Sequence, residues 1–323
     1  MQVARRQDKS AGSVVPRTGN ESPLISVVIP SYNHGHFIGD AIESVFAQTY
    51  SHHEIIVVDD GSTDRTSEVV AQYPEVSYVR QRNQGPSAAR NCGIQKSRGD
   101  YVVFLDADDR LLPQHFEISL DAFRSHPDIG WVCGNFRFLG SDPTWRHIHV
   151  CEPLPDYFGT FLRGNFIVAP FVVMYRRQPL VESGGFDERV RSCEDWEFYL
   201  RLIKQAPLYC HHQIVGEYRI TDQQASRYWH FVLKWGVQVM RSKWRLVCGN
   251  PLYEEGYSVG LTRLRSRYGE RALWQMVADA RSGQRVQALR ALWVLLRCYP
   301  FGLVSLFKSK MHKIFPIRKL GSS

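Results

Sequence analysis

Residues 101–109 read Tyr-Val-Val-Phe-Leu-Asp-Ala-Asp-Asp, and this stretch decides the fold. Its first five residues form a short apolar run, rich in β-branched and aromatic side chains, which predicts a buried strand. Three carboxylates follow at the strand's carboxyl end, where open α/β sheets bind their ligands. Asp106 and Asp108 can turn toward one point, where two carboxylates repel unless a cation joins them. Oxygen ligands suit Mg²⁺ or Mn²⁺, so the stretch predicts a divalent metal site or an acidic surface turn.

The composition is that of a globular protein. At 323 residues, 44% of them hydrophobic, the chain can form one large domain or two ordinary ones. Its seven cysteines form no C-x-x-C pair, which argues against a disulfide framework or zinc site and for a reducing compartment. Residues 1–22 are polar, so we expect a disordered tail rather than a signal peptide. No stretch reaches the ~18–20 apolar residues that span a bilayer, and we expect a cytoplasmic protein.

Charge is distributed unevenly along the chain. The net charge is +8, yet residues 226–323 hold 18 Lys and Arg against 4 Asp and Glu, a net +14 that leaves −6 for residues 1–225. Such a basic segment suggests an anionic partner, and without a nucleic-acid-binding motif that partner is not expected to be nucleic acid. Residues 300–323 interleave apolar residues with lysines. They predict either a helix on the anionic inner face of the cytoplasmic membrane or a helix docked on the rest of the chain.

Strand and helix patterns alternate between residues 24 and 109. Buried strands are predicted at 24–30, 54–58, 76–80 and 101–105, and amphipathic helices at 37–48, 63–72 and 85–94. This order is typical of a parallel sheet with right-handed crossovers. The loops at 31–36, 59–63 and 106–109 then leave the same carboxyl edge, and we expect them to cluster in space.

The remaining sequence is less regular. Strands are predicted at Ile129–Cys133 and Phe166–Tyr175, and a helix near Asp195–Lys204. Beyond residue 226 strand signals fade, and Gly269–Leu296 has the apolar stripe of a helix. We therefore expect three parts: the tail 1–22, an α/β domain over 23–225 and a basic helical region over 226–323.

Two motifs in the first part suit a nucleotide. Asp59-Asp60-Gly61-Ser62 directly follows a strand, and its carboxylates can accept from a base N–H or a ribose hydroxyl. The alternative is an Asp-Gly turn in which Ser62 caps the next helix. Farther on, Gly85-Pro86 begins a helix whose N-terminus suits phosphate, and Arg90 adds a planar, positively charged guanidinium group. That segment also fits an ordinary helix with a surface arginine.

A second acidic focus is Glu194-Asp195, at the start of the helix that contains Trp196. Their spacing alone favours N-terminal helix capping by acids. The functional alternative is a general base, because a carboxylate near a metal-bound phosphate ester can deprotonate an incoming hydroxyl.

The order of these motifs closely resembles the family 2 glycosyltransferases of the GT-A fold. The motifs are Pro30-Ser31-Tyr32-Asn33, Asp59-Asp60-Gly61-Ser62, Ala89-Arg90-Asn91-x-Gly93, Asp106-x-Asp108-Asp109, and Gly184-Gly185-Phe186-Asp187 with Glu194-Asp195. Together they cover about residues 23–220 and are far more specific than any one alone. The resemblance implies a Rossmann-like α/β fold with a mainly parallel sheet, a helical C-terminal extension, and an inverting transfer from a nucleotide-sugar to an acceptor hydroxyl.

The resemblance also implies a role for each motif. The nucleotide-binding residues would be Pro30, Tyr32, Asn33, Asp59, Asp60, Ser62, Arg90 and Asp106. Asp60 would bind the base, usually uracil, while Asp106 would contact ribose or metal and Asp108 would hold Mn²⁺ or Mg²⁺ on the diphosphate. Asp195 matches the catalytic base, and Glu194 and Trp196 would flank the acceptor. By analogy, that acceptor is a sugar or lipid-linked sugar in bacterial cell-surface polysaccharide or glycolipid assembly.

The sequence departs from the family's pattern at one point. Many relatives carry a His shortly after a Tyr-Arg pair, whereas here Tyr218-Arg219-Ile220 is followed by Thr221-Asp222. Asp222 or a phosphate oxygen would fill the role, or metal binding is weaker. Two rival hypotheses therefore stay open: a non-catalytic scaffold with a decayed metal site, and a phosphoryl-transfer enzyme that uses the Asp-x-Asp motif. The intact Asp106, Asp108 and Asp195 argue against the scaffold.

Overall fold

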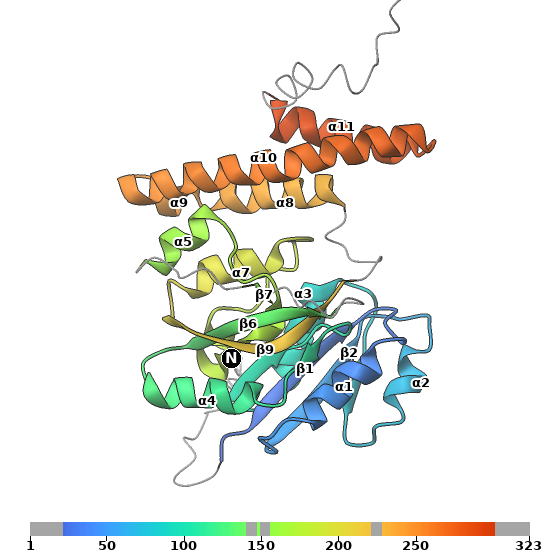
Figure 1. The fold of residues 1–323 in the computed structure, drawn as a ribbon, viewed down its shortest axis with the longest axis vertical. Coiled ribbons are helices and arrows are strands. Elements are labelled where there is room, and N and C mark those ends of the chain that lie inside the picture. Colours follow the sequence, from blue (N-terminus) through green and yellow to red (C-terminus); the bar gives the residue numbers. More distant parts are fainter. Residues whose placement is uncertain (1–21, 140–146, 149–155, 221–227, 301–323) are drawn as a thin grey trace, which may run out of the picture.

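The computed structural model describes residues 22–139, 147–148, 156–220 and 228–300. A curved sheet with helices packed against it forms one part, and a layer of long C-terminal helices lies across α5 and α7 (Figure 1). The functional questions concern the carboxyl edge of the sheet and its junction with that helical layer.

The first half of the sheet is parallel. Its strands are β1 (Ile25–Ser31), β2 (His53–Asp59), β3 (Ser77–Arg80) and β4 (Tyr101–Phe104), in the spatial order β3-β2-β1-β4. Ser31 lies opposite Asp59 in the parallel register, so these two strands end side by side. The predicted parallel sheet, with its loops at one edge, is confirmed for these strands.

The second half of the sheet mixes directions. It contains β5 (Arg110–Leu111), β6 (Trp131–Leu139), β7 (His147–Ile148), β8 (Val173–Arg176) and β9 (Leu208–Arg219). Strand β8 pairs antiparallel with both β4 and β6, whereas β9 runs parallel to β6 and antiparallel to β5. The pairing of β5 with β9 brings the end of β9 to the loop after β4.

The predicted strand over Phe166–Tyr175 is mostly wrong. A 3₁₀ turn, η1 (Pro170–Val172), occupies its middle, and the strand begins only at Val173. Pro170 has no backbone N–H to donate to a ladder, so a central strand cannot pass through it. The apolar run is buried because it packs on the sheet, which periodicity alone does not distinguish from pairing within it.

In the part of the chain that the structure describes, seven α-helices lie between the strands. They are α1 (Ile38–Phe46), α2 (Thr66–Val70), α3 (Pro86–Lys96), α4 (His115–Ser125), α5 (Tyr157–Arg163), α6 (Arg177–Glu182) and α7 (Glu194–Leu202). Helix α3 lies directly on β1, because a Cβ atom at Gly93 would come 2.1 Å from the Val28 side chain. This close approach fixes the start of α3, including Arg90, relative to the carboxyl edge of the sheet.

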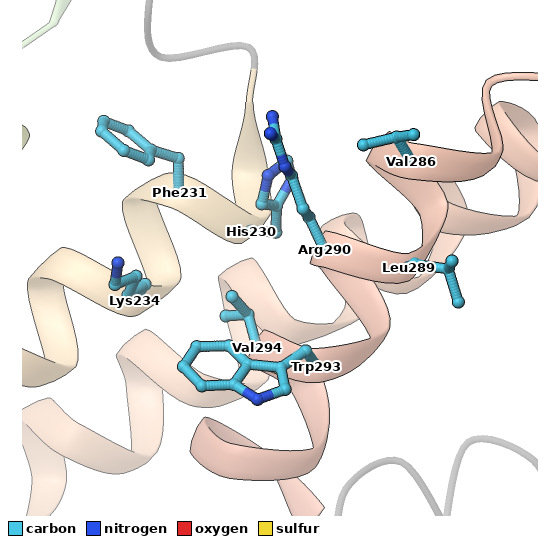
Figure 2. A pocket seen from close by; sticks show the side chains of 8 residues that line it. All are labelled: His230, Phe231, Lys234, Val286, Leu289, Arg290, Trp293 and Val294. Atoms are coloured by element: carbon cyan, nitrogen blue, oxygen red, sulfur yellow. The ribbon is translucent and has the colours of Figure 1, made fainter.

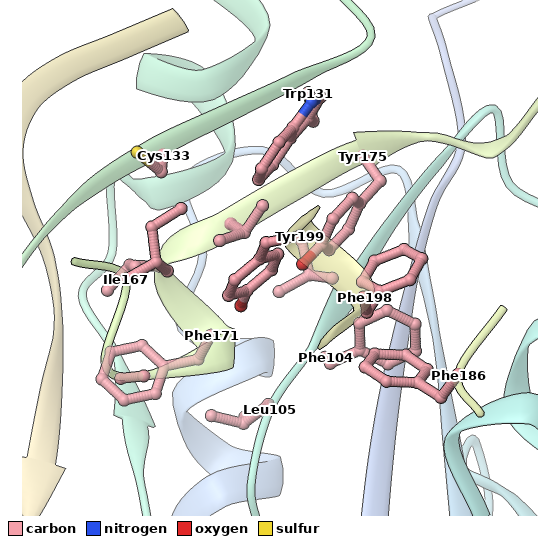
Figure 3. Close-up of a cluster of buried hydrophobic side chains, with 14 of the residues drawn as sticks. Phe104, Leu105, Trp131, Cys133, Ile167, Phe171, Tyr175, Phe186, Phe198 and Tyr199 are labelled. Carbon is pink, nitrogen blue, oxygen red and sulfur yellow. The ribbon is translucent and has the colours of Figure 1, made fainter. Parts of the chain in front are cut away.

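A buried aromatic cluster connects the sheet to α7. Trp131 of β6 stacks near Tyr175 of β8 and Tyr199 of α7, with ring centroids 6.1 and 5.5 Å apart. Phe104 of β4 meets Phe186 edge-on at 5.2 Å (Figure 3). Burying each aromatic side chain contributes about 1.5–3 kcal/mol to stability. The cluster therefore holds α7, which begins with Glu194 and Asp195, rigidly over the sheet.

The C-terminal region is helical, as expected. It contains α8 (Trp229–Ser242), α9 (Trp244–Val247), α10 (Pro251–Arg281) and α11 (Arg285–Cys298). The continuous helix predicted over Gly269–Leu296 is wrong in detail, because Gly283 adopts a φ of 79° and separates α10 from α11. Among the described helices, none is long and apolar enough to cross a membrane.

Close contacts tie this helical layer to helices α5 and α7. The Lys243 ammonium at the end of α8 donates to the Glu197 carboxylate of α7 at 2.7 Å, and both side chains are buried. Gly260 of α10 lies so close to the end of α5 that a Cβ atom there would come 1.9 Å from the Leu162 carbonyl oxygen. The division of the chain at residue 226 stays a prediction, but these contacts bring α10 to the same cavity as α7.

Candidate active site

The first two loops of the carboxyl edge are bonded to each other. Asn33, after β1, has a φ of 57°, and its side-chain oxygen accepts from the Thr63 backbone N–H at 2.8 Å. In return, the Asn33 backbone N–H donates to the Ser62 hydroxyl at 2.9 Å. Pro30 is buried in β1, whereas Tyr32 is 46% exposed beside it. These predicted nucleotide-binding residues therefore lie together at one edge of the sheet.

Asp59 and Asp60 are both buried, and they hold different segments. The Asp59 carboxylate accepts from the Ser62 backbone N–H at 2.7 Å and from the Tyr78 hydroxyl. This contact and burial raise the pKa of Tyr78 to about 12. The Asp60 carboxylate accepts from the backbone N–H groups of Gln84 and Gly85, at 2.9 and 2.7 Å. Asp59 thus supports its own loop, and Asp60 fastens the segment that leads into α3.

Asp106 and Asp108 influence each other electrostatically in the loop after β4, and their convergence on one metal ion stays a prediction. Burial and the charge of Asp106 raise the pKa of the Asp108 carboxyl, and the nearby His34 opposes that shift. Asp109 is buried behind them, and burial together with the charge of Asp106 raises its pKa further. Its carboxylate accepts from the backbone N–H of Arg219 at 2.9 Å. Asp109 therefore shapes the turn instead of facing the site.

Arg219 at the end of β9 secures this turn from the other side. Its guanidinium donates to the Asp108 carbonyl oxygen at 2.9 Å and to the Asp40 carboxylate of α1 at 2.7 Å. It also lies 4.9 Å from the centroid of the Phe37 ring. Arg219 thus fixes the backbone of Asp108 relative to α1. Thr221, the departure from the family pattern, lies outside the described residues.

Arg90 bridges the two acidic foci of the chain. Its guanidinium donates to the Asp106 carboxylate at 2.8 Å and to the Glu194 carboxylate at 3.0 Å. Arg90 itself is buried, and its charge lies 5.4 Å from the Phe186 ring centroid. The neighbouring Asn91 side chain bonds both the N–H and the carbonyl of Phe186, at 2.8 and 2.9 Å. The start of α3 thus joins the loop after β4 to the start of α7.

Asp195 begins α7 in an environment that suits a base. Burial and the charge of Glu194 raise the pKa of its carboxyl to about 7. The Asn165 side chain donates to the carboxylate at 3.0 Å, from the loop that follows α5. Trp196 is nearly fully buried, and its indole N–H donates to the Phe161 carbonyl oxygen at 2.9 Å. A base is most effective when its pKa lies near the working pH.

One cavity of about 680 Å³ brings these groups together. Asp106 and Arg90 line one side of it, and Glu194, Asp195 and Trp196 line another. The far wall comes from α5, α10 and the segments beside them and includes Thr160, Arg163, Asn165, Val232, Gly260, Arg263, Leu264, Arg267 and Tyr268. A cavity of this size can hold a drug-sized ligand.

Sequence reasoning missed several residues of this cavity. Asn165, which orients Asp195, lies in a segment with no motif, and the arginines of α10 lie in a region marked only by its net charge. Glycine spacing was the one available signal, because Gly256 and Gly260 are one helical turn apart. The predicted acceptor-side residues Glu194 and Trp196 do line the cavity, although Glu194 is also held by Arg90.

The carboxylates after β4 suit a divalent cation. Among the described residues, no cluster of three or more His, Cys, Asp and Glu side chains could enclose a metal by itself. Asp108 nevertheless has a raised pKa, next to Asp106, which is the condition that a cation would relieve. Two hard oxygen ligands plus phosphate oxygens form the mixed shell that Mg²⁺ and Mn²⁺ accept. The donor set therefore fits a metal that is shared with a diphosphate.

A second cavity, of about 640 Å³, lies between α8 and α11 (Figure 2). It is lined by His230, Phe231, Lys234, Val286, Leu289, Arg290, Trp293 and Val294. None of these residues carries a carboxylate. The cavity therefore has an apolar and basic lining, without the carboxylates that line the first cavity.

Sequence comparisons find related proteins over the α/β part of the chain. The family model described as "Glycosyl transferase family 2" matches residues 26–182. The chain is 30% identical over 216 residues to the putative teichuronic acid biosynthesis glycosyltransferase TuaG of Bacillus subtilis, covering 64% of this chain and 83% of that protein. It is 30% identical over 207 residues to chondroitin synthase of Escherichia coli, covering 63% and 29%. An uncharacterized glycosyltransferase of Rickettsia typhi is 27% identical, and the match spans 66% of its length.

Solved structures share the fold at low sequence identity. S. aureus TarS 1-349 in complex with UDP-GlcNAc superposes with a TM-score of 0.64 at 18% identity, covering 85% of this chain and 81% of that one. The mannosyltransferase PcManGT from Pyrobaculum calidifontis, in complex with GDP-Man and Mn²⁺, gives 0.57 at 17% identity, covering 91% and 86%. At these identities the likeness concerns the fold alone, and the expected GT-A-like α/β fold is confirmed.

Proposed function

Since this chain belongs to glycosyltransferase family 2, we propose that it transfers a sugar, with inversion, from a nucleotide-diphosphate sugar to an acceptor hydroxyl. One observation carries the proposal: a single cavity is lined by Asp106 and by Asp195, and Arg90 bridges the two sides. A donor held at Asp106 and a base at Asp195 are the two elements that a single displacement requires. The rival phosphoryl-transfer hypothesis does not require a base at Asp195.

The donor side would hold the nucleotide through the loops after β1, β2 and β4. Asn33 and Ser62 clasp two of these loops together, so their backbone is preorganised before any ligand arrives. Tyr32 is exposed beside them and can pack on a base. Asp106 would accept from ribose or face the metal, and Asp60 would hold the segment leading into α3 while it contacts the base.

Asp106 and Asp108 would hold a divalent cation, which supplies positive charge for the leaving diphosphate. Arg90 would neutralise part of the remaining negative charge, because its buried guanidinium contacts both Asp106 and Glu194. This arrangement keeps three carboxylates close together without leaving them all uncompensated.

Asp195 would act as the base. The acceptor oxygen forms a bond to the anomeric carbon, the bond from that carbon to the diphosphate oxygen breaks, and the leaving nucleoside diphosphate takes the electron pair. The acceptor's proton passes to the Asp195 carboxylate, which Asn165 holds in place. Attack from the face opposite the leaving group inverts the configuration, because no protein nucleophile intervenes.

The donor and the biological setting are narrower proposals. A UDP-sugar is favoured, because the TarS structure that shares this fold was solved with UDP-GlcNAc. Polysaccharide assembly is favoured, because two relatives are a teichuronic acid glycosyltransferase and chondroitin synthase. The sugar or lipid-linked sugar that accepts the transfer would enter beside Glu194 and Trp196.

A thermal-shift titration tests the proposed function. UDP with Mn²⁺ should raise the melting temperature of the full chain, and Asp108→Ala should abolish the metal-dependent part of that shift. Asp121→Ala is a matched control, because Asp121 is an exposed carboxylate on α4 that pairs only with Arg124. No shift with any of UDP, GDP, ADP or CDP, with or without metal, contradicts the proposal and leaves the non-catalytic scaffold.

We also propose that the C-terminal region touches an anionic membrane surface. The segment originally expected to do so, residues 300–323, lies almost wholly outside the described residues. Helix α11 supports the idea, because it exposes an apolar stripe of Val286, Leu289, Trp293 and Leu296. Figure 2 shows the first three of these side chains on α11. Arg285, Arg290 and Arg297 flank the stripe, and α11 has no acidic residue. Apolar stripes with basic flanks are typical of helices in the membrane interface.

Vesicle sedimentation tests this second proposal. The full chain should bind vesicles of phosphatidylcholine with phosphatidylglycerol and should not bind phosphatidylcholine alone. Replacing Leu289 and Trp293 with serine should weaken binding, whereas replacing Leu252, an apolar residue 71% exposed on α10, should not. Equal binding by all three proteins would contradict a role for α11.

A further inference from the structure

We infer that the acceptor carries an anionic group, a phosphate or a carboxylate, which Arg263 and Arg267 of α10 bind. The inference rests on the proposed function, because it takes the cavity at Asp195 as the acceptor site. Both arginines line that cavity together with Asp106 and Glu194, and they come from a different helix. They would supply acceptor selectivity on a helix that lies outside the matched family region of residues 26–182.

Within the residues that the structure describes, the two arginines differ from the other arginines of the cavity in having no ionic partner. Within the part of the chain that the structure describes, Arg90 pairs with Asp106 and Glu194, and Arg163 pairs with Glu255 at 3.3 Å. Arg263 and Arg267 make no ion pair there, and both are exposed. Their positions, four residues apart, place them on one face of α10. The cavity therefore presents a pair of uncompensated guanidinium groups.

The packing of α10 fixes where these groups lie. Gly260 is one turn before Leu264 and brings the helix against the Leu162 carbonyl oxygen, where a Cβ atom would lie 1.9 Å away. The segment directly after that contact holds Asn165, whose side chain bonds Asp195. Consequently the α10 arginines and the proposed base are positioned by the same short stretch of chain. A group bound by the arginines would be held at a constant distance from the base.

The chemistry of guanidinium groups indicates the class of ligand. Arginine is always charged and presents donors in a planar fork that matches carboxylate or phosphate oxygens in pairs. A neutral glycan would need hydroxyl and amide partners and would leave these two charges unmatched. A phosphodiester or uronic acid unit next to the reacting hydroxyl would match them.

The competing assignment is that these arginines hold the donor's diphosphate. The proposed cation ligand Asp108, where that diphosphate would bind, does not line this cavity, although Asp106 does. The arginines share the cavity instead with Asn165, Asp195 and Trp196, on the proposed acceptor side. The geometry therefore favours the acceptor, and the donor assignment becomes an outcome of the test.

The experiment compares two double variants of the full chain. Arg263→Gln with Arg267→Gln removes the proposed site, and Arg245→Gln with Arg281→Gln removes the same charge from exposed positions on α9 and at the end of α10. Direct binding is measured by calorimetry with three probes of equal length: a uronic-acid-containing oligosaccharide, a glycerol-phosphate oligomer and a neutral glucan. UDP binding with Mn²⁺ is measured on the same samples.

The wild-type chain should bind at least one acidic probe more tightly than the neutral glucan. Comparing the uronic-acid probe with the glycerol-phosphate probe shows whether carboxylate or phosphate is the better ligand. The first double variant should bind the acidic probe roughly 10–100-fold more weakly, as expected when charge-assisted hydrogen bonds are lost. UDP affinity should be unchanged, and the control variant should behave as wild type. Binding should also weaken with added salt.

Three results would overturn the inference. These are equal affinity for acidic and neutral probes in the wild type, an equal loss in the control variant, or a fall in UDP affinity in the first variant, which would assign the arginines to the donor. Failure of the proposed function has a different signature, because UDP with Mn²⁺ would then bind none of the proteins. Probe binding is read without turnover, so the two failures are distinguishable.

Discussion

The proposed site has a donor side, here called the donor wall, and an acceptor side, here called the acceptor wall, and the two are built in different ways. Of the donor wall, Arg90 and Asp106 line the cavity. The donor wall comes from loops that directly follow parallel strands, so contiguous motifs such as Asp59-Asp60 and Asp106-Asp108 arrive at one edge together. The acceptor wall comes from α5, α7 and α10, which are far apart in sequence. It is held by single contacts, of which Asn165 with Asp195 and Lys243 with Glu197 are examples.

This difference between the two walls predicts where mutations are tolerated. A loop that directly follows a strand is positioned by the hydrogen bonds between the strands. The donor wall therefore depends on the fold itself. A helix such as α10 depends on a few packing contacts, so its side chains can change while the donor wall stays intact. Donor binding and acceptor binding should therefore respond separately to mutation, and the following predictions test that separation.

The largest expected effect is on turnover, from a change in the acceptor wall. Asp195→Asn removes the proposed base and should lower kcat by ~10²–10⁴-fold, the usual contribution of general acid–base catalysis. UDP affinity should stay within a factor of about two, since Asp195 does not contact the donor loops. Steady-state kinetics and UDP titration measure the two quantities, and unchanged turnover would exclude Asp195 as the base.

Much of the donor wall could be predicted from the sequence, and the reason is physical. Apolar runs identify strands, and parallel strands deliver their following residues to one edge, so the meeting of the Asn33 and Ser62 loops could be predicted. Arg90 was predicted as a phosphate ligand, yet its guanidinium bridges Asp106 and Glu194, and a role toward the nucleotide stays a prediction.

The acceptor wall could not be predicted in the same way. The contact of Asn165 with Asp195 spans 30 positions and has no periodic signal. The residues that bring α10 to the cavity are glycines, and their role depends on what a Cβ atom would meet, which only the fold reveals. Pro170 is the exception, because its missing N–H was visible in the sequence and argues against the strand that was predicted there.

The next largest effect is expected from the buried link between α7 and the C-terminal helices. Lys243→Met leaves Glu197 buried with only Arg201 as its partner and should lower the free energy of unfolding by about 3 kcal/mol. Urea denaturation measures this, with the exposed Arg241→Met of α8 as the control. If both variants lose equal stability, the buried pair does not anchor the helical layer.

A smaller effect is expected where α10 meets α5. Gly260→Ala places a Cβ atom against the Leu162 carbonyl and should cost about 1–3 kcal/mol of stability, because overpacking outweighs the helix propensity that alanine gains. Gly256→Ala is the matched control, since its Cβ atom would lie 3.3 Å from the Gly159 carbonyl oxygen, a far less severe approach than that at Gly260. Thermal melts compare the two. Greater destabilisation by Gly256→Ala would contradict the packing described for α10.

The smallest and most specific effect concerns pH. Because the pKa of Asp195 is about 7 and a base must be deprotonated, kcat should fall as pH decreases through about 7. The Asn165 side chain donates to the carboxylate and lowers this pKa, so Asn165→Ala should move the acidic limb to higher pH. The charge of Glu194 raises it, so Glu194→Gln should move the limb to lower pH. Shifts of up to about one unit are expected, with UDP affinity measured at each pH as the control. Opposite shifts in the pH–kcat profiles would identify Asp195 as the titrating group, whereas equal shifts in UDP affinity would place the titration in the donor wall.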